Sequence, residues 1–216
     1  PLTHILVMGM GAPLANLDHL LEALEVATTS SEGVGKGKQT RFGLGLSARN
    51  ITISTVGLPL KIRKLADLKK QYHLAVSLHA PNEEIRAKIV PTGERTGLEE
   101  ILQAADYFYD QTHRQVTYEY VLLRDVNDRR EHAEELAWLL RDRQAHINLI
   151  PFNDVEGLPY REPERESVRA FVSLLRERGL IVHVRKRKGA DIDAACGQLR
   201  RSAQEDRLQL NVAPKL

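Results

Sequence analysis

The sequence predicts an α/β fold, a partial (β/α) barrel, from three observations. Short apolar segments rich in β-branched residues alternate with amphipathic helical patterns, which is typical of βα units and a parallel sheet. With 216 residues, 42% hydrophobic and 28% charged, the chain has the size and composition of one soluble globular domain. Polar clusters directly follow several apolar segments, where parallel sheets place ligand sites. An open doubly wound sheet is the alternative fold.

Six segments combine apolar and β-branched residues over the length of a strand. The predicted strands are residues 3–9, 50–55, 73–79, 115–123, 145–152 and 181–186. Helical patterns separate them, so we expect neighbouring strands to pair in parallel.

Five segments between these strands have helical periodicity. The predicted helices are residues 17–27, 60–71, 98–111, 129–141 and 164–178. Asn16 and Pro59 precede the first two, as is typical of helix starts, and Gly179 follows the last as a cap. The third helix carries one apolar stripe, formed by Leu98, Ile101, Leu102, Ala105 and Phe108.

The pattern indicates one domain, residues 1–201, followed by a tail, residues 202–216, that we expect to be poorly ordered. Residues 28–45 are rich in Gly, Ser and Thr and are expected to form a long, mobile surface loop. No apolar run approaches the length of a membrane span and no signal peptide is recognisable, so we expect a cytoplasmic protein without a membrane partner. Because the first residue is Pro1 rather than Met, we expect the chain to be part of a longer polypeptide.

Polar residues gather where four of the predicted strands end. The first strand ends in Gly9-Met10-Gly11-Ala12-Pro13, and the others end near Ser54, at Ser77-Leu78-His79 and at Asn153. Each cluster alone could be a turn or a cap, but four at one edge of a sheet favour a ligand rich in hydroxyl, amino and carboxylate groups, such as a nucleoside with an amino-acid tail. We interpret His79 as a hydrogen-bonding wall residue rather than a metal ligand. Glu119, between two tyrosines, faces either the barrel interior, where it needs a partner, or the helix layer.

The single cysteine, Cys196, excludes an internal disulfide and any multi-cysteine iron–sulfur site built from this chain alone. It follows the basic run Arg185–Lys188, and residues 185–201 contain six Lys and Arg against two Asp. Neighbouring cations favour the reactive thiolate, so Cys196 is a candidate nucleophile; the alternative is a small buried hydrophobe. The basic patch either contacts phosphate or is an ordinary solvated surface.

Four segments together, in matching order, resemble one family. They are GMGAPL (9–14), SLHAPN (77–82), NLIPFN (148–153) and DIDAACGQL (191–199). The chain resembles the radical S-adenosylmethionine adenine-C2 RNA methyltransferases, the RlmN/Cfr family, from Pro1 to about Arg201. The resemblance implies a partial (β/α)6 radical-SAM-type barrel that methylates C2 of adenosine in 23S rRNA and in some tRNAs.

The resemblance also implies cofactors and site residues. One S-adenosylmethionine methylates Cys196, and a second is cleaved by a 4Fe-4S cluster, reduced by an electron donor, to a radical that activates the cysteine-borne methyl group. By position, the residues implied to contact S-adenosylmethionine are Gly11, Ala12, Ser54, Ser77, Leu78, His79 and Asn153.

This sequence departs from the family pattern in ways that affect activity. The Cys-x3-Cys-x2-Cys loop that holds the cluster is absent, so the first strand here corresponds to the family's second and the barrel lacks its first βα unit. The N-terminal RNA-binding region and a second catalytic cysteine are absent as well, and the family's Gly-Glu-Pro is Gly11-Ala12-Pro13. We therefore expect these 216 residues to be inactive alone. A diverged, non-catalytic RNA-binding barrel and a C8-adenosine methyltransferase of the same family remain as alternatives.

Overall fold

The computed structural model describes residues 2–8, 12–30, 43–90, 96–155 and 157–185 and contains one sheet of six parallel strands. The strands lie side by side in the order in which they occur along the chain. They are β1 (Ile5–Val7), β2 (Ile51–Thr55), β3 (His73–Ser77), β4 (Val116–Leu122), β5 (Ala145–Pro151) and β6 (Ile181–Val184). Because the order never reverses, the sheet has no switch point of the kind found in doubly wound folds. The partial barrel is confirmed over that alternative.

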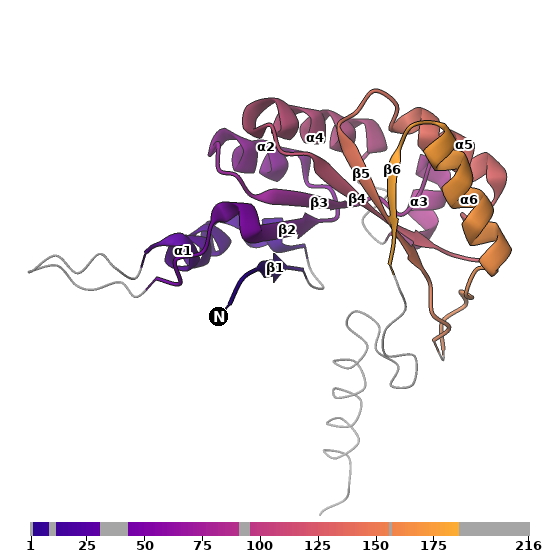
Figure 1. The fold of residues 1–216 in the computed structure, drawn as a ribbon, viewed down its shortest axis with the longest axis horizontal. Helices are drawn as coiled ribbons and strands as arrows, with labels where there is room; N and C mark the ends of the chain where they lie inside the picture. Colours follow the sequence, from indigo (N-terminus) through magenta and orange to yellow (C-terminus); the bar gives the residue numbers. More distant parts are fainter. Residues whose placement is uncertain (1, 9–11, 31–42, 91–95, 156, 186–216) are drawn as a thin grey trace, which may run out of the picture.

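Helices connect the strands and cover one face of the curved sheet, as Figure 1 shows for α2, α4, α5 and α6. Each crossover between parallel strands packs its helix back onto the sheet on the same side. The α-helices are α1 (Leu17–Thr28), α2 (Pro59–Asp67), α3 (Glu83–Ile89), α4 (Leu98–Thr112), α5 (Arg130–Leu139) and α6 (Arg165–Glu177). Two short 3-10 helices, η1 (Pro13–Asn16) and η2 (Ala48–Asn50), precede α1 and β2.

The two faces of the sheet differ in chemistry because successive side chains of a strand point to opposite faces. The helix-facing side is the apolar core, to which the strands contribute residues such as Ile53, Leu74, Tyr118, Ile147 and Val182. The opposite side, which we call the concave face, carries the alternate residues. The register places Ser77 beside Glu119, Glu119 beside Asn148, and Asn148 beside His183 on that face. A polar row therefore crosses the concave face.

The sequence did not indicate α3. This helix has seven residues, which is too short for helical periodicity to stand out. Asn82 caps it by accepting a hydrogen bond from the Ile85 N–H at 3.0 Å. The other differences are at boundaries: β1 is shorter than predicted, and α2 ends at Asp67, shortly before Lys69 with its φ of 51°.

Several expectations lie outside the described residues: most of the loop 28–45, Gly11, most of the basic run, Cys196 and the tail. Within the described ranges, none of the helices combines the length and the apolar character that crossing a membrane requires.

Candidate functional site

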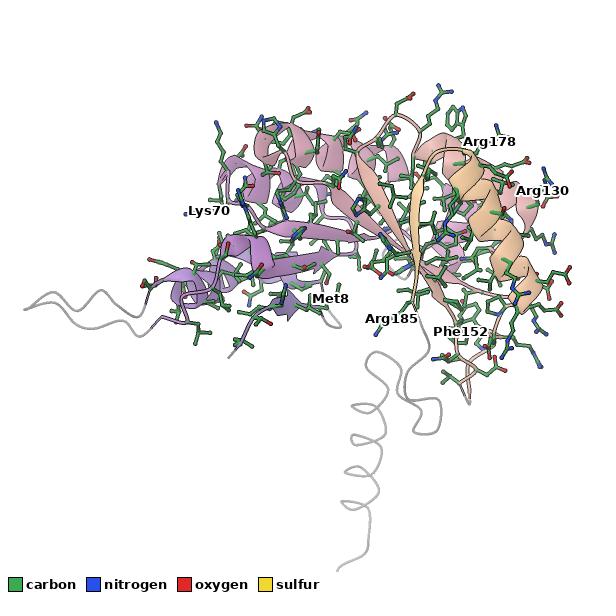
Figure 2. All side chains as sticks on the ribbon, viewed as in Figure 1. Met8, Lys70, Arg130, Phe152, Arg178 and Arg185 are labelled. Carbon is green, nitrogen blue, oxygen red and sulfur yellow. The ribbon has the colours of Figure 1, made fainter. Side chains whose placement is uncertain are left out.

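The predicted strand-end residues lie along one edge of the sheet, at the carboxyl ends of the parallel strands. Ser54 and Ser77 are near or at the ends of β2 and β3, and Asn153 follows β5. Figure 2 labels three residues that directly follow strands: Met8 after β1, Phe152 after β5 and Arg185 after β6. All three lie toward the same side of the molecule. The structure thus brings together the described residues of the predicted site, while Gly11 lies outside the description.

The two serines contribute hydroxyl groups on the concave face. Ser54 Oγ donates to the Val7 carbonyl at 3.2 Å, which ties β2 to β1 and leaves the oxygen's lone pairs free to accept. Ser77 Oγ makes no hydrogen bond to another described residue. Its hydroxyl can therefore both donate to and accept from a ligand.

Leu78 and Ala12 offer backbone rather than side-chain chemistry. Leu78 is fully buried; its N–H donates to the Glu119 carbonyl at 3.0 Å, and its own carbonyl accepts from Arg86. Ala12 has a φ of 44°, in the region that normally favours glycine, and its carbonyl accepts from the Ala15 N–H at 2.8 Å to start η1. Both residues thereby set the path of the chain at this edge.

His79 is held as a neutral hydrogen-bonding group. It is partly buried, with a φ of 61°, and the Val121 N–H donates to its Nδ1 at 3.2 Å. Burial and, next, the charge of Arg86 lower the pKa of His79 to about 4, against a hydrogen bond with the Glu119 backbone that raises it. At neutral pH the ring is uncharged, and since Nδ1 accepts, its proton is on Nε2. His79 therefore presents an N–H donor.

Arg86 was not expected from the sequence and, with 1% of its surface exposed, is the most buried charged residue in the described part of the chain. It lies on α3 and points back under the strand ends. Its Nη1 donates to the carbonyls of Ser77 at 2.9 Å and Leu78 at 2.6 Å, and its Nη2 donates to the Val56 carbonyl at 2.5 Å. Burial lowers its pKa, while Glu83 raises it. One guanidinium thus ties the end of β3 to the chain that follows β2.

Asn127 is a second fixing residue that the sequence did not reveal. It is fully buried after β4, and its Nδ2 donates to the carbonyls of His79 at 2.8 Å and Val121 at 2.7 Å. Its Oδ1 accepts from the Leu123 N–H at 2.7 Å. His79 lies 48 positions before Asn127 in the chain and Val121 lies 6 positions before it. Local sequence patterns therefore do not indicate the contact with His79.

Comparison with known proteins identifies the fold family. The sequence model of the Radical SAM superfamily matches residues 1–137. The chain belongs to the radical SAM superfamily. A crystal structure of a radical SAM methyltransferase from Sphaerobacter thermophilus is similar with a TM-score of 0.82 and 41% identity, over 91% of this chain and 55% of that one. A domain of a pyruvate-formate lyase-activating enzyme from Bacteroides vulgatus is similar in fold, with a TM-score of 0.62 and 16% identity, over 85% of this chain and 99% of its own.

Curated relatives of this radical SAM chain have a common name. A probable dual-specificity RNA methyltransferase RlmN from Rhodopirellula baltica is 50% identical over 94% of this chain and 52% of its own length. A protein of the same name from Gloeobacter violaceus is 43% identical over 92% of this chain and 53% of its own length. The chain spans about half the length of the curated relatives it matches.

Radical SAM proteins use S-adenosylmethionine and a 4Fe-4S cluster, and the residues present fit these two groups differently. Three cysteines hold the cluster in the resembled family, whereas this chain has one, and the described residues contain no group of three or more His, Cys, Asp or Glu suited to a metal. The cofactor fits better. The hydroxyls of Ser54 and Ser77, the N–H of His79 and the amide of Asn153 match the hydroxyl, amino and carboxylate groups of S-adenosylmethionine.

Proposed function

We propose that this chain forms the S-adenosylmethionine-binding barrel of a radical SAM RNA methyltransferase. Its reaction is methylation of C2 of adenosine in 23S rRNA and tRNA, in a reducing, cytoplasmic setting. The observation that carries the proposal is the similarity over 92–94% of the chain to proteins named dual-specificity RNA methyltransferase. The polar strand ends support it, because they offer what this cofactor needs.

In this proposal the chain's own residues bind and orient the cofactor and accept its methyl group. When bound, S-adenosylmethionine supplies the methyl group and, with an externally reduced 4Fe-4S cluster held outside this chain, the radical chemistry. Ser54, Ser77, His79 and Asn153 hold the cofactor through neutral hydrogen bonds. The Cys196 thiolate would accept that methyl group on its sulfur, and S-adenosylhomocysteine would leave.

A chimera tests this function. The part of the Rhodopirellula baltica relative that precedes the matched region is joined to this chain. The chimera is reconstituted anaerobically with iron and sulfide and given S-adenosylmethionine, a reductant and unmodified 23S rRNA or tRNA. We expect 2-methyladenosine in the digested RNA by mass spectrometry, and none from the matched Cys196→Ala chimera. Turnover that persists without the Cys196 thiol contradicts the methyl-carrier role.

A second candidate, a diverged RNA-binding barrel without catalysis, has one observation in its favour. Ala12 stands where the resembled family has glutamate, which removes a carboxylate that could accept from the cofactor's amino group. The same chimera distinguishes the candidates: RNA binding without any methylated adenosine indicates the non-catalytic barrel, and 8-methyladenosine in place of 2-methyladenosine indicates the C8 reaction.

A further inference from the structure

Glu119 differs in charge from the other residues of the sheet. In the six strands that the structure describes it is the only acidic residue. It lies in the middle of β4 and is 8% exposed. An ionised carboxyl at such a position loses most of its hydration, so its presence requires an explanation.

The side chain of Glu119 faces the concave side, toward the predicted cofactor site. Its neighbours Tyr118 and Tyr120 belong to the core under the helices, which places Glu119 on the opposite face. The register sets it directly beside Ser77 on β3. Its backbone carbonyl accepts from the N–H groups of Leu78 at 3.0 Å and His79 at 3.1 Å. Glu119 is therefore joined to three of the residues that the proposed cofactor site uses.

One neighbour fixes the carboxyl group. Asn148 Nδ2 donates to Glu119 Oε2 at 2.7 Å from the adjacent strand. Among the described residues, no donor bonds the second oxygen, Oε1, and Glu119 belongs to no described ion pair. Burial raises the pKa of Glu119, while Asn148 and then the charge of Arg185 lower it. Asn148 thus fixes the orientation of the carboxyl group and gives a hydrogen bond to one of its two oxygens. Ionisation of this buried group costs free energy unless a further partner binds the other oxygen.

The charges around the site indicate what that partner is. Arg86 acts on His79, and Arg185 acts on Glu119, while His79 itself is neutral. For a positively charged ligand held at these strand ends, Glu119 is the only acidic counter-charge that the described strands offer. S-adenosylmethionine differs from S-adenosylhomocysteine by one methyl group and one positive charge, on sulfur.

We propose that Glu119, positioned by Asn148, supplies the negative charge that faces the sulfonium of S-adenosylmethionine and so makes the site prefer this cofactor to S-adenosylhomocysteine. This inference rests on the proposed function. It assigns a specificity role to a residue that the strand-end motifs do not include, and it provides a means of releasing the demethylated product: loss of the methyl group removes the charge that Glu119 attracts.

The test is the binding of both nucleosides to the full 216-residue chain by isothermal titration calorimetry, with Glu119→Gln and, as a matched control on the exposed side of α5, Glu131→Gln. We expect Glu119→Gln to weaken S-adenosylmethionine by about tenfold, the effect of roughly one charge contact, and S-adenosylhomocysteine by less than about twofold. Acidification should weaken S-adenosylmethionine binding more in the wild type than in Glu119→Gln, because protonation removes the charge of Glu119 only where that charge exists. Protonation of His79, whose pKa is about 4, affects both proteins equally.

Folding provides an independent check on the variant. Because the folded-state pKa is raised, the buried carboxylate disfavours folding at neutral pH, so Glu119→Gln should unfold at a temperature equal to or above that of the wild type. Equal weakening of both nucleosides, or of neither, overturns the inference while leaving the cofactor site intact. A wild type that binds neither nucleoside overturns the cofactor site itself and this inference with it.

Discussion

Replacement of Arg86 by methionine tests how the strand ends are held. The variant keeps a long side chain but removes the donors to the carbonyls of Ser77, Leu78 and Val56. Each buried carbonyl left without a donor costs about 1 kcal/mol or more, and relief from burying a charge offsets part of the loss. We therefore expect Arg86→Met to lower the free energy of unfolding by about 3 kcal/mol.

Urea denaturation followed by circular dichroism measures this loss. With a slope of about 2 kcal/mol per molar urea, the midpoint should fall by about 1.5 M. The matched control is Arg130→Met, whose side chain is 79% exposed and which should change stability by less than about 0.5 kcal/mol. The variant should also raise the pKa of His79 from about 4, because the Arg86 charge that lowers it is gone. A loss below about 1 kcal/mol would refute the fixing role.

Three further predictions concern the same edge. His79→Asn keeps an acceptor for the Val121 N–H and tolerates positive φ, but it cannot titrate. Because the pKa of His79 is lowered from 6.5 to about 4, the neutral ring stabilises the folded state above pH 6.5, and this stabilisation is lost as the pH falls toward 4. In urea titrations over that range, the free energy of unfolding of the wild type should fall by about 3 kcal/mol more than that of the variant. Parallel pH profiles would contradict this. Asn127→Ala removes three hydrogen bonds to backbone groups and should lower the thermal midpoint by several degrees, so an unchanged midpoint would mean that the His79 segment is held by other contacts. Ala12→Glu should tighten S-adenosylmethionine about tenfold in calorimetry, and an unchanged dissociation constant would show that side chain 12 does not face the cofactor.

The fold was predictable from the sequence because the local pattern of apolar residues indicates each strand. In β2, buried and half-buried positions alternate strictly from Ile51 to Thr55, and the amphipathic α4 buries the predicted stripe from Leu98 to Phe108. The short helix α3 was missed because its seven residues complete barely two turns, so that packing of the buried Ile85 and Arg86 rather than periodicity determines it.

Of the candidate site, only the first layer was predictable from the sequence, that is, the polar side chains at the strand ends that would contact the ligand. Polar residues that follow apolar strands could be recognised one strand at a time, and the parallel sheet brings Ser54 and Ser77 to the same edge. The groups that hold this layer in place come from elsewhere: Arg86 reaches back 30 positions to Val56, and Asn127 reaches back 48 to His79. Such pairings depend on the tertiary fold, and one sequence contains no pattern that specifies them.

We propose above all that S-adenosylmethionine binds at the carboxyl ends of these strands. A titration of the isotope-labelled chain with S-adenosylmethionine, in which NMR follows every backbone amide, tests this. We predict that the amides of Ser54, Ser77, His79 and Asn153 shift together along one saturable curve, while those of α4 and α5 on the opposite face stay in place. Shifts confined to the outer helices, or none up to millimolar cofactor, would contradict the claim.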